Sequence, residues 1–322
     1  MSKTIRSSLC LLFIVISIFN LIHWGISLNR NRVKIKQLNK DTVFVRIGNE
    51  YCGRLKNRAL ETREGDIYCA RYRENIEFIR GEYYTTVLSS ILGIRNTPDV
   101  YIEQVKPDAE LWLRVWKNLE AAGWRPLAVV SITLFIPDLQ TVEFPPYLKD
   151  CINCKLDKEY NEELTPEESN FLTQWSDMIL LDYVTGDVDR VIGHVHNLKW
   201  DDRSFNRPVH NLMKDQEGSL YFFDNESAFG HSYRLLARYQ TLHDVTLKRV
   251  CVFSRRTKKK LTELAEKSVD VLKENFRGTE LVPPLPEKDI LTLKTRLLEA
   301  DTHVRLGCSY NTPYFLYPTS ES

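Results

Sequence analysis

The chain has 322 residues, 43% hydrophobic and 27% charged, which is enough to bury a substantial core in one large domain or in two lobes. Its 44 Lys and Arg nearly balance 43 Asp and Glu, but seven of the basic residues lie in residues 1–40, which contain no acid. Removing these seven leaves 37 basic against 43 acidic residues in the rest of the chain. The charge therefore excludes the basic excess that is typical of nucleic-acid-binding proteins, and we expect no nucleic-acid partner.

Residues 9–28 form a nearly unbroken apolar run, and about 20 such residues span a bilayer. A cleavable signal peptide normally has a shorter apolar region and a small-residue cleavage site, and Ser27 offers only a poor one. We therefore predict a signal-anchor transmembrane helix at 9–28, after a tail of residues 1–8 and before a stem of residues 29–45. A cleavable signal peptide is the alternative.

Two features of the sequence indicate on which side of the membrane the C-terminal part lies, and they disagree. Lys3 and Arg6 precede the apolar run and five basic residues follow it, so the positive-inside rule alone would leave the long C-terminal part in the cytosol. Six cysteines lie beyond the run, and an even count behind an export signal favours disulfides in an oxidising lumen. Six reduced cysteines in a cytosolic enzyme are the alternative.

The first half of the body predicts a small sheet and one helix. Residues 41–46 and 67–73 alternate in the manner of strands, with a turn at residues 64–66. Apolar residues then recur at helical spacing from Tyr84 to Ile91, with Glu82 in the first turn and Gly93 as the stop. A further strand group is predicted at residues 127–136, and the loop-like composition after it marks a lobe boundary at 145/146.

The second half predicts mainly helices. Thr165, Pro166 and Glu168 form a helix start with a capping box, and Trp175 belongs to the buried stripe of that helix. Residues 261–276 and 289–304 carry two more helical patterns. Strands with one helix first and helices afterwards predict an α+β protein with two lobes.

Two acidic clusters stand out in this framework. The first is Asp187-Val-Asp189, which follows the capped helix, and the second is Asp224-Asn-Glu226, at the end of an apolar strand. Together they could hold a divalent metal and a proton acceptor, the minimum apparatus for phosphate chemistry. Asp187-Val-Asp189 alone also fits the metal-binding motif of a type II Golgi glycosyltransferase, although that motif usually follows a parallel strand.

The ordered motifs resemble those of the four-jointed family, which belongs to the secretory-pathway kinases related to the Golgi casein kinase. The resemblance extends from about Tyr51 to Cys308. The motifs that carry it are Gly81-Glu82, Leu92-Gly-Ile94, Trp175-Ser-Asp-Met-Ile-Leu-Leu-Asp-Tyr183, Asp189-Arg190, His210-Asn-Leu212, Phe223-Asp-Asn-Glu226 and Val250-Cys-Val-Phe253.

The resemblance implies an atypical protein-kinase-like fold, with a small N-terminal sheet lobe at 46–145, a mainly helical C-terminal lobe at 146–310 and a tail at 311–322. It implies a type II Golgi membrane protein with a luminal catalytic domain, which stem cleavage could also release. The implied activity is phosphorylation of Ser or Thr in cadherin repeats of the Fat and Dachsous type, with ATP and Mn²⁺ or Mg²⁺. Planar cell polarity and growth signalling are the processes that this modification tunes.

The family pattern also assigns roles to residues. Asp189 corresponds to the catalytic Asp, and Asp224 to the metal-binding Asp of an Asp-Asn-Glu motif. Glu82 corresponds to the helix Glu that pairs with the phosphate-binding cation of an N-lobe strand. Arg71 takes the position of that cation, which is usually Lys, with Arg73 and Lys56 as neighbours.

A second departure from the family pattern lies five residues beyond Asp189, where the relatives carry an Asn for the metal. This chain has His194 there; imidazole can bind Mn²⁺, although oxygen ligands suit Mg²⁺ better. Asn197 and Asn211 are alternative ligands. Arg71 and His194 motivate a second hypothesis, in which the chain is a catalytically silent member of the family that binds a partner or nucleotide.

Following the resemblance, Cys52 is expected to pair with Cys69 and Cys251 with Cys308. Cys151 and Cys154 could close a small loop. Asn225 begins the only glycosylation sequon in the chain, and we expect it to be unmodified because it lies in the predicted cleft. Residues 255–260 contain the main basic cluster, which is either a solvated helix entrance or a docking site for an acidic partner.

Overall fold

The computed structural model describes residues 36–48, 52–53, 56–145 and 165–308, all within one unit that spans residues 35–322. The first lobe is built on a five-stranded sheet in which each strand is antiparallel to its neighbours, in the order β1-β2-β3-β5-β4. These strands are β1 (Phe44–Gly48), β2 (Arg58–Thr62), β3 (Ile67–Tyr72), β4 (Val100–Gln104) and β5 (Val129–Leu134). The predicted strands at 41–46, 67–73 and 127–136 correspond to β1, β3 and β5.

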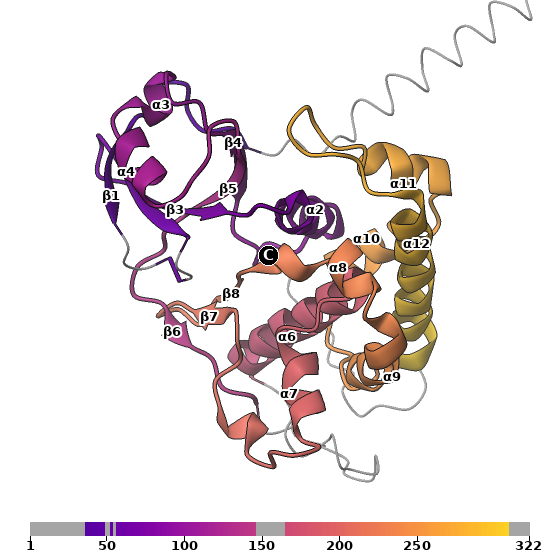
Figure 1. Cartoon of the computed structure of the whole chain (residues 1–322). Helices are drawn as coiled ribbons and strands as arrows, with labels where there is room; N and C mark the ends of the chain where they lie inside the picture. Colours follow the sequence, from indigo (N-terminus) through magenta and orange to yellow (C-terminus); the bar gives the residue numbers. More distant parts are fainter. Residues whose placement is uncertain (1–35, 49–51, 54–55, 146–164, 309–322) are drawn as a thin grey trace, which may run out of the picture. The chain divides into compact units, whose positions relative to one another are not determined.

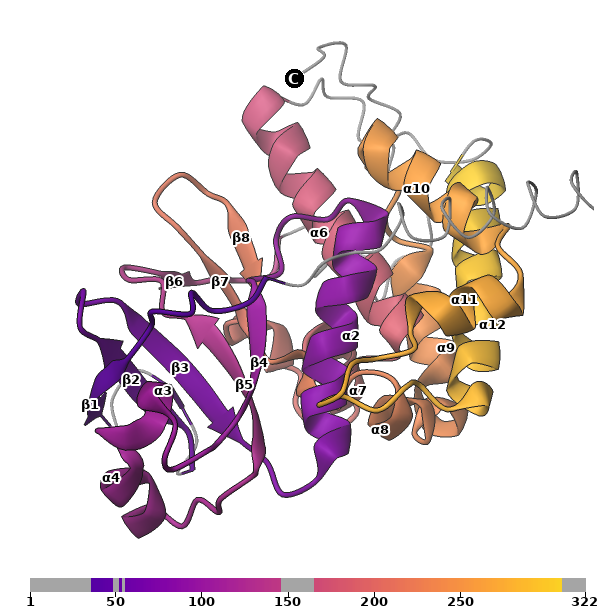
Figure 2. The ribbon, with the colours of Figure 1, turned by 90° about the horizontal axis from the view of Figure 1, so that it is seen from above.

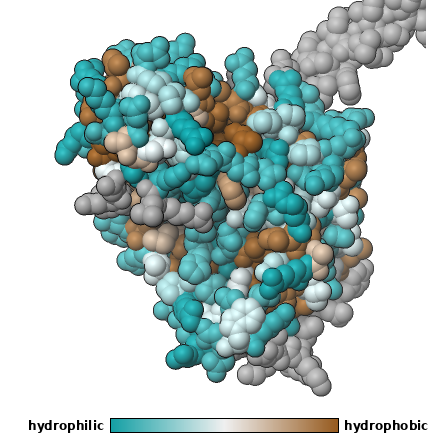
Figure 3. Space-filling view, in the orientation of Figure 1, coloured by the Kyte–Doolittle hydropathy of each residue, from teal (hydrophilic) through white to brown (hydrophobic). Residues whose placement is uncertain are grey.

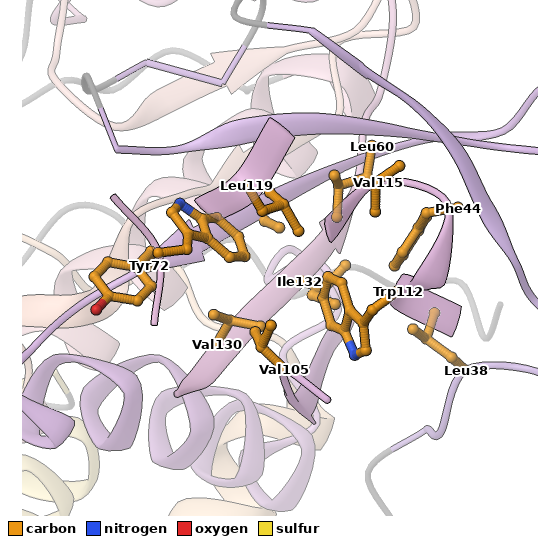
Figure 4. Packing of buried hydrophobic residues seen from close by; sticks show 12 residues of the cluster. Leu38, Phe44, Leu60, Tyr72, Val105, Trp112, Val115, Leu119, Val130 and Ile132 are labelled. Atoms are coloured by element: carbon orange, nitrogen blue, oxygen red, sulfur yellow. The ribbon is translucent and has the colours of Figure 1, made fainter. Parts of the chain in front are cut away.

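The core of this lobe lies between the sheet and two short helices, α3 (Glu110–Leu113) and α4 (Trp116–Ala121). Trp112 belongs to this core and packs against Phe44 (Figure 4); their ring centroids are 5.4 Å apart. The disulfide Cys52–Cys69 fastens the segment before β2 to β3, which confirms the first expected cysteine pair.

Helix α2 (Ile76–Leu92) lies between the five-stranded sheet and the helical lobe in both ribbon views (Figures 1 and 2). It begins five residues before Gly81, where the sequence predicted the Gly81-Glu82 start, because the Asn75 side chain accepts a hydrogen bond from the Glu77 amide and caps the helix. Gly93 ends it with a left-handed φ of 78°, as predicted. Glu82 therefore lies in the middle of the helix.

The second lobe contains α6 (Pro166–Thr185), whose predicted capping box between Thr165 and Glu168 is present. Beside it lies a three-stranded antiparallel sheet in the order β6-β7-β8. Its strands are β6 (Gln140–Thr141), β7 (Leu212–Lys214) and β8 (Leu220–Phe222). Short helical segments connect these elements: α7 (Val191–Asn197), the 3₁₀ turn η1 (Ser204–Asn206) and the 3₁₀ turn η2 (Asn225–Ser227).

The remaining helices are α8 (Gly230–Tyr233), α9 (Leu236–Leu247), α10 (Arg255–Ala265), α11 (Val269–Asn275) and α12 (Glu287–Thr302), followed by a π-helical turn, His303–Gly307. The pattern predicted as one helix at 261–276 is divided between α10 and α11, because Ser268 caps a new helix start. The disulfide Cys251–Cys308 joins the segment before α10 to the end of this region and confirms the second expected pair.

Several predictions fall outside the described residues: the transmembrane helix at 9–28, the lobe boundary at 145/146, Cys151, Cys154 and the tail at 311–322. Among the described residues, no helix has the length and apolar character needed to cross a bilayer. The face of the molecule in Figure 3 is largely hydrophilic, with apolar side chains in scattered patches.

Candidate active site

An ion pair connects the five-stranded sheet to helix α2. Arg71, on β3, donates to Glu82 on α2; the Glu82 side chain is 2% exposed and the Arg71 side chain 12%. Arg71 Nη1 also lies 3.7 Å from Asp224 Oδ1, on the loop after β8. The structure thus brings together Arg71, Glu82 and Asp224, three of the site residues predicted from the sequence.

Burial and charge oppose each other at this ion pair. Burial raises the pKa of Glu82 to about 7, while Arg71 lowers it and Asp224 and Glu226 raise it further. For Arg71, burial disfavours the cation, but the carboxylates of Glu82, Asp224 and Glu226 outweigh it and raise the pKa above its ordinary value. Arg71 is therefore a permanent cation, and an anion such as a phosphate would compete with Glu82 for its guanidinium.

A second ion pair links Arg73, the residue after β3, to Glu226 on η2. Arg73 Nε lies 2.5 Å from Glu226 Oε2, and Arg73 also donates to Asn57 Oδ1 at 2.8 Å. This close packing requires Gly81 on α2, since a Cβ at that position would lie 2.4 Å from the Glu226 carbonyl oxygen. Gly81 thus lets α2 lie directly on η2, the turn that follows Asp224.

The candidate catalytic base, Asp189, lies on the loop between α6 and α7. Its backbone N–H donates to Asp187 Oδ1 at 2.9 Å, which fixes the turn. Ser227 Oγ donates to Asp189 Oδ2 at 2.7 Å, and Ser227 is held in turn because its carbonyl accepts from Ser232 Oγ at 2.7 Å. One oxygen of the Asp189 carboxylate is therefore oriented by the loop that carries Asp224.

Arg190 connects the Asp189 loop to the Asp224 loop. It is fully buried, and its guanidinium donates to both carboxylate oxygens of Asp182 on α6, with the shortest distance 2.6 Å. The same group donates to the Phe223 carbonyl at 2.9 Å and to Asn225 Oδ1 at 2.8 Å. Phe223 and Asn225 flank Asp224, and Arg190 follows Asp189. These bonds therefore hold the Asp224 loop in place against the Asp189 loop. They also engage the buried side chain of Asn225, and the absence of a glycan at its sequon remains a prediction.

Asp187 is enclosed by the protein beside a buried cation. It is 1% exposed, and burial raises the pKa of its carboxyl to about 8, although Arg190 at 3.7 Å lowers it. Its Oδ1 already accepts from the Asp189 amide, and its Oδ2 lies beside the Arg190 guanidinium. This geometry argues against the glycosyltransferase interpretation of Asp187-Val-Asp189.

Asp224 has the properties expected of a metal ligand. Its backbone is in the left-handed region, with φ 54° and ψ 56°, and its side chain is 20% exposed. Its Oδ1 is buried and has no hydrogen-bond partner among the described residues. It faces a cavity of about 10 Å³ that Arg71, Glu82, Thr133 and Phe223 help to line, enough for one water. An unsatisfied carboxylate oxygen of this kind fits Mn²⁺ or Mg²⁺.

His194, predicted as a further metal ligand, lies in an aromatic cluster. Its Nδ1 is 2.8 Å from the Ser204 carbonyl oxygen, and its ring packs 4.9 Å from Phe144 and 5.4 Å from His210. Burial lowers the pKa of His194, so the ring is neutral at physiological pH. Its contacts are those of a core histidine, and none that the structure records joins it to Asp224.

The other two predicted site residues lie apart from the Arg71–Glu82 pair. Lys56 is on the surface, where its Nζ lies 2.8 Å from Glu74 Oε1 and 5.5 Å from the centre of the Tyr72 ring. Asn211 adjoins the site through its backbone, because its carbonyl accepts from the Phe223 amide at 2.9 Å.

Comparison with known proteins identifies the family. The model of the Four-jointed box protein middle domain matches residues 29–310. The chain belongs to the four-jointed box family. Four-jointed box protein 1 of Xiphophorus maculatus is 34% identical over 232 residues, which cover 71% of this chain and 54% of the relative. The extracellular serine/threonine protein kinase four-jointed of Drosophila melanogaster is 26% identical over 302 aligned residues. This match covers 76% of this chain and 52% of the relative.

These relatives are longer proteins, and the chain spans about half the length of the curated relatives it matches. Among solved structures, the crystal structure of the Golgi casein kinase with Mn and ADP bound matches with a TM-score of 0.57 and 14% sequence identity. The match covers 84% of this chain and 74% of that chain. The four-jointed resemblance and the kinase-like mixed fold predicted from the sequence are thereby confirmed.

Proposed function

We propose that the chain is a serine/threonine protein kinase that acts in the Golgi lumen, anchored as a type II membrane protein. The observation that carries the proposal is the linkage of Asp189 to Asp224 through Arg190 and Ser227, opposite the Arg71–Glu82 pair. A proton acceptor, a metal-type carboxylate and a phosphate-type cation thus share one site between two lobes. Phosphoryl transfer requires this combination, because its catalysis is mostly positioning and charge stabilisation.

In the proposed reaction, Asp189 accepts the proton of a Ser or Thr hydroxyl as the hydroxyl oxygen attacks the γ-phosphorus of ATP. A bond forms between that oxygen and phosphorus, and the bond from the γ-phosphorus to the bridging oxygen breaks, so ADP leaves. Arg71 binds phosphate oxygens, and Glu82 orients it. Asp224 would hold Mn²⁺ or Mg²⁺, which neutralises phosphate charge when bound.

The proposed acceptors are extracellular cadherin repeats of the Fat and Dachsous type, so that the chain would act in planar cell polarity and growth signalling. The family membership and the similarity to the Drosophila extracellular serine/threonine protein kinase four-jointed support this proposal. Both disulfides support a luminal rather than a cytosolic domain.

A catalytically silent, nucleotide-binding relative is the second candidate. Two observations favour it: His194 lies among aromatic rings and not beside Asp224, and the cavity between Arg71, Glu82 and Asp224 is small. The two candidates differ in one measurable property, the transfer of phosphate.

The test uses the full-length chain in mild detergent, with ATP, Mn²⁺ and purified cadherin repeats, and maps phosphorylated residues by mass spectrometry. The kinase proposal predicts phosphoserine or phosphothreonine with wild type and none with Asp189→Ala or Asp224→Ala. If the folded wild type binds ATP, seen as a raised Tm, but modifies no repeat in a panel, the silent relative is correct.

A further inference from the structure

A polar groove of about 230 Å³ lies at the C-terminal end of α2, away from the candidate active site. Its walls are the end of α2, the loop from Gly93 to Asp99 and the start of α10. Arg95 contributes from the loop and Arg256 from α10. Gly93 allows this arrangement, because a Cβ there would lie 2.4 Å from Arg256 Nε. The Arg256 side chain thus lies against the end of α2.

Two arginines, Arg95 and Arg256, and one acid, Asp99, line the groove. Arg256 belongs to residues 248–260, which contain seven basic residues and no acid. Many exposed cations elsewhere have acidic partners, such as Lys56 with Glu74 and Lys273 with Glu287. By contrast, Arg95 and Arg256 have no ion pair among the described residues. The acid in the groove, Asp99, is already paired with Lys36 at 2.6 Å.

Hydroxyl groups line the groove beside the two guanidinium groups. Thr86, Ser89, Ser90 and Thr97 contribute them, and Ser89 Oγ lies 2.6 Å from Thr97 Oγ1. The Thr86 hydroxyl donates to the Glu82 carbonyl and the Ser89 hydroxyl to the Ile94 carbonyl. The donors that remain for a ligand are mainly the two guanidinium groups, which bind carboxylates with paired N–H bonds. We propose that this groove docks an acidic segment of a partner protein through its Asp and Glu side chains.

The groove is physically connected to the candidate active site. Its loop carries Asn96, whose carbonyl accepts from the Phe222 amide at 2.9 Å and whose Nδ2 donates to the Leu220 carbonyl at 2.8 Å. Phe222 ends β8, two residues before Asp224. Along α2, Glu82 and Gly93 are 11 residues apart, or about 16 Å. An extended segment of about five residues covers that length.

A protein acceptor could therefore occupy the groove and the active site together. This consequence rests on the proposed kinase function, whereas the docking itself does not. Docking outside the reacting centre binds substrate and transition state equally, so it would lower KM for the acceptor and leave kcat nearly unchanged.

The experiment measures binding without ATP or metal, so that its result is independent of catalysis. A fluorescent peptide of alternating Glu and Gly is titrated with the full-length chain in mild detergent, and anisotropy is recorded at two salt concentrations. The test variant is Arg95→Ala with Arg256→Ala. The matched control is Arg63→Ala with Arg114→Ala, two exposed arginines of the sheet lobe. A peptide of alternating Gln and Gly controls for the charge of the ligand.

We expect the wild type and the control to bind the acidic peptide equally, and the test variant to bind about tenfold more weakly. Added salt should weaken wild-type binding. The proposal is overturned if the test variant binds like the wild type, if both double variants lose affinity equally, or if the Gln peptide binds as tightly as the Glu peptide.

Discussion

Gly81→Ala should lower the rate of phosphate transfer far more than it lowers the stability of the fold. The new Cβ would lie 2.4 Å from the Glu226 carbonyl oxygen, whereas ordinary contacts begin at 3.4 Å, so α2 and η2 must move apart by about 1 Å. Overpacking costs about 1–3 kcal/mol, and replacing Gly by Ala within a helix returns about 1 kcal/mol. The net loss of stability is therefore about 0–2 kcal/mol. The same displacement moves Glu82 and Arg71 relative to Asp224 and should lower the transfer rate about 100-fold.

The assay compares initial rates of phosphate transfer with the free energy of unfolding from urea titrations. Gly123→Ala is the matched control: its φ of +81° makes Ala unfavourable, and nothing lies within 4 Å of the added Cβ. We expect it to cost about 1–2 kcal/mol without changing the rate per folded molecule. If Gly81→Ala transfers phosphate at the wild-type rate, or if both variants lose rate in proportion to stability, the reasoning about α2 and η2 is wrong.

Three further predictions follow from individual contacts. Ser227→Ala should lower kcat about tenfold with little change in KM, because Asp189 loses its orienting hydrogen bond; Ser227→Thr should restore the rate. Arg190→Met should lower the free energy of unfolding in urea by about 3–5 kcal/mol, because it leaves the buried Asp182 carboxylate without its partner. Burial raises the pKa of Asp177 from 3.8 to about 7, so its neutral form is favoured in the folded chain. Its contribution to stability is full at low pH and declines as the pH rises from 4 to 7, by at most about 4 kcal/mol; Asp177→Asn should remove that decline.

Each of these predictions has an outcome that contradicts it. For Ser227, the contradiction is equal kcat for the Ala variant and wild type, or failure of Thr to restore it. For Arg190, it is an unchanged urea midpoint. For Asp177, it is the same dependence of stability on pH in wild type and Asp177→Asn, with Asp108→Asn, at an exposed position, as the control.

Local signals in the sequence predicted the helices that position the site. The capping box of Thr165 and Glu168 marked the start of α6, and Gly93 marked the end of α2, because both depend on hydrogen bonds within a few residues. Strands β2 and β4 were not predicted. Their burial is set by neighbouring strands and not by a clear alternation of their own.

Residue patterns alone marked the two acidic clusters, and the family motifs then assigned the individual roles within the site. Asp189, Asp224, Glu82 and Arg71 were assigned in this way; their placement together is observed, and their roles remain predictions. The partnership of Arg73 with Glu226 was missed because 153 residues separate them, and no local pattern reports such a contact.

Two residues predicted as ligands have contacts of another kind in the structure, and their roles remain predictions. Lys56 is close to β3 in the sequence, but its side chain lies on the surface beside Glu74. His194 occupies the sequence position of a metal ligand, yet its ring completes an aromatic cluster with Phe144. The direction in which a side chain points is set by tertiary packing, and the spacing of residues along the sequence does not reveal it.

The most direct test of the account follows labelled γ-phosphate from ATP to protein in the full-length wild type, Asp189→Asn and Asp224→Asn, with nucleotide binding measured in parallel. The account predicts transfer by wild type alone. It also predicts that Asp189→Asn still binds Mn²⁺ and ATP, whereas Asp224→Asn binds them more weakly. Transfer by Asp189→Asn at the wild-type rate would contradict it, because the proton acceptor would then lie elsewhere.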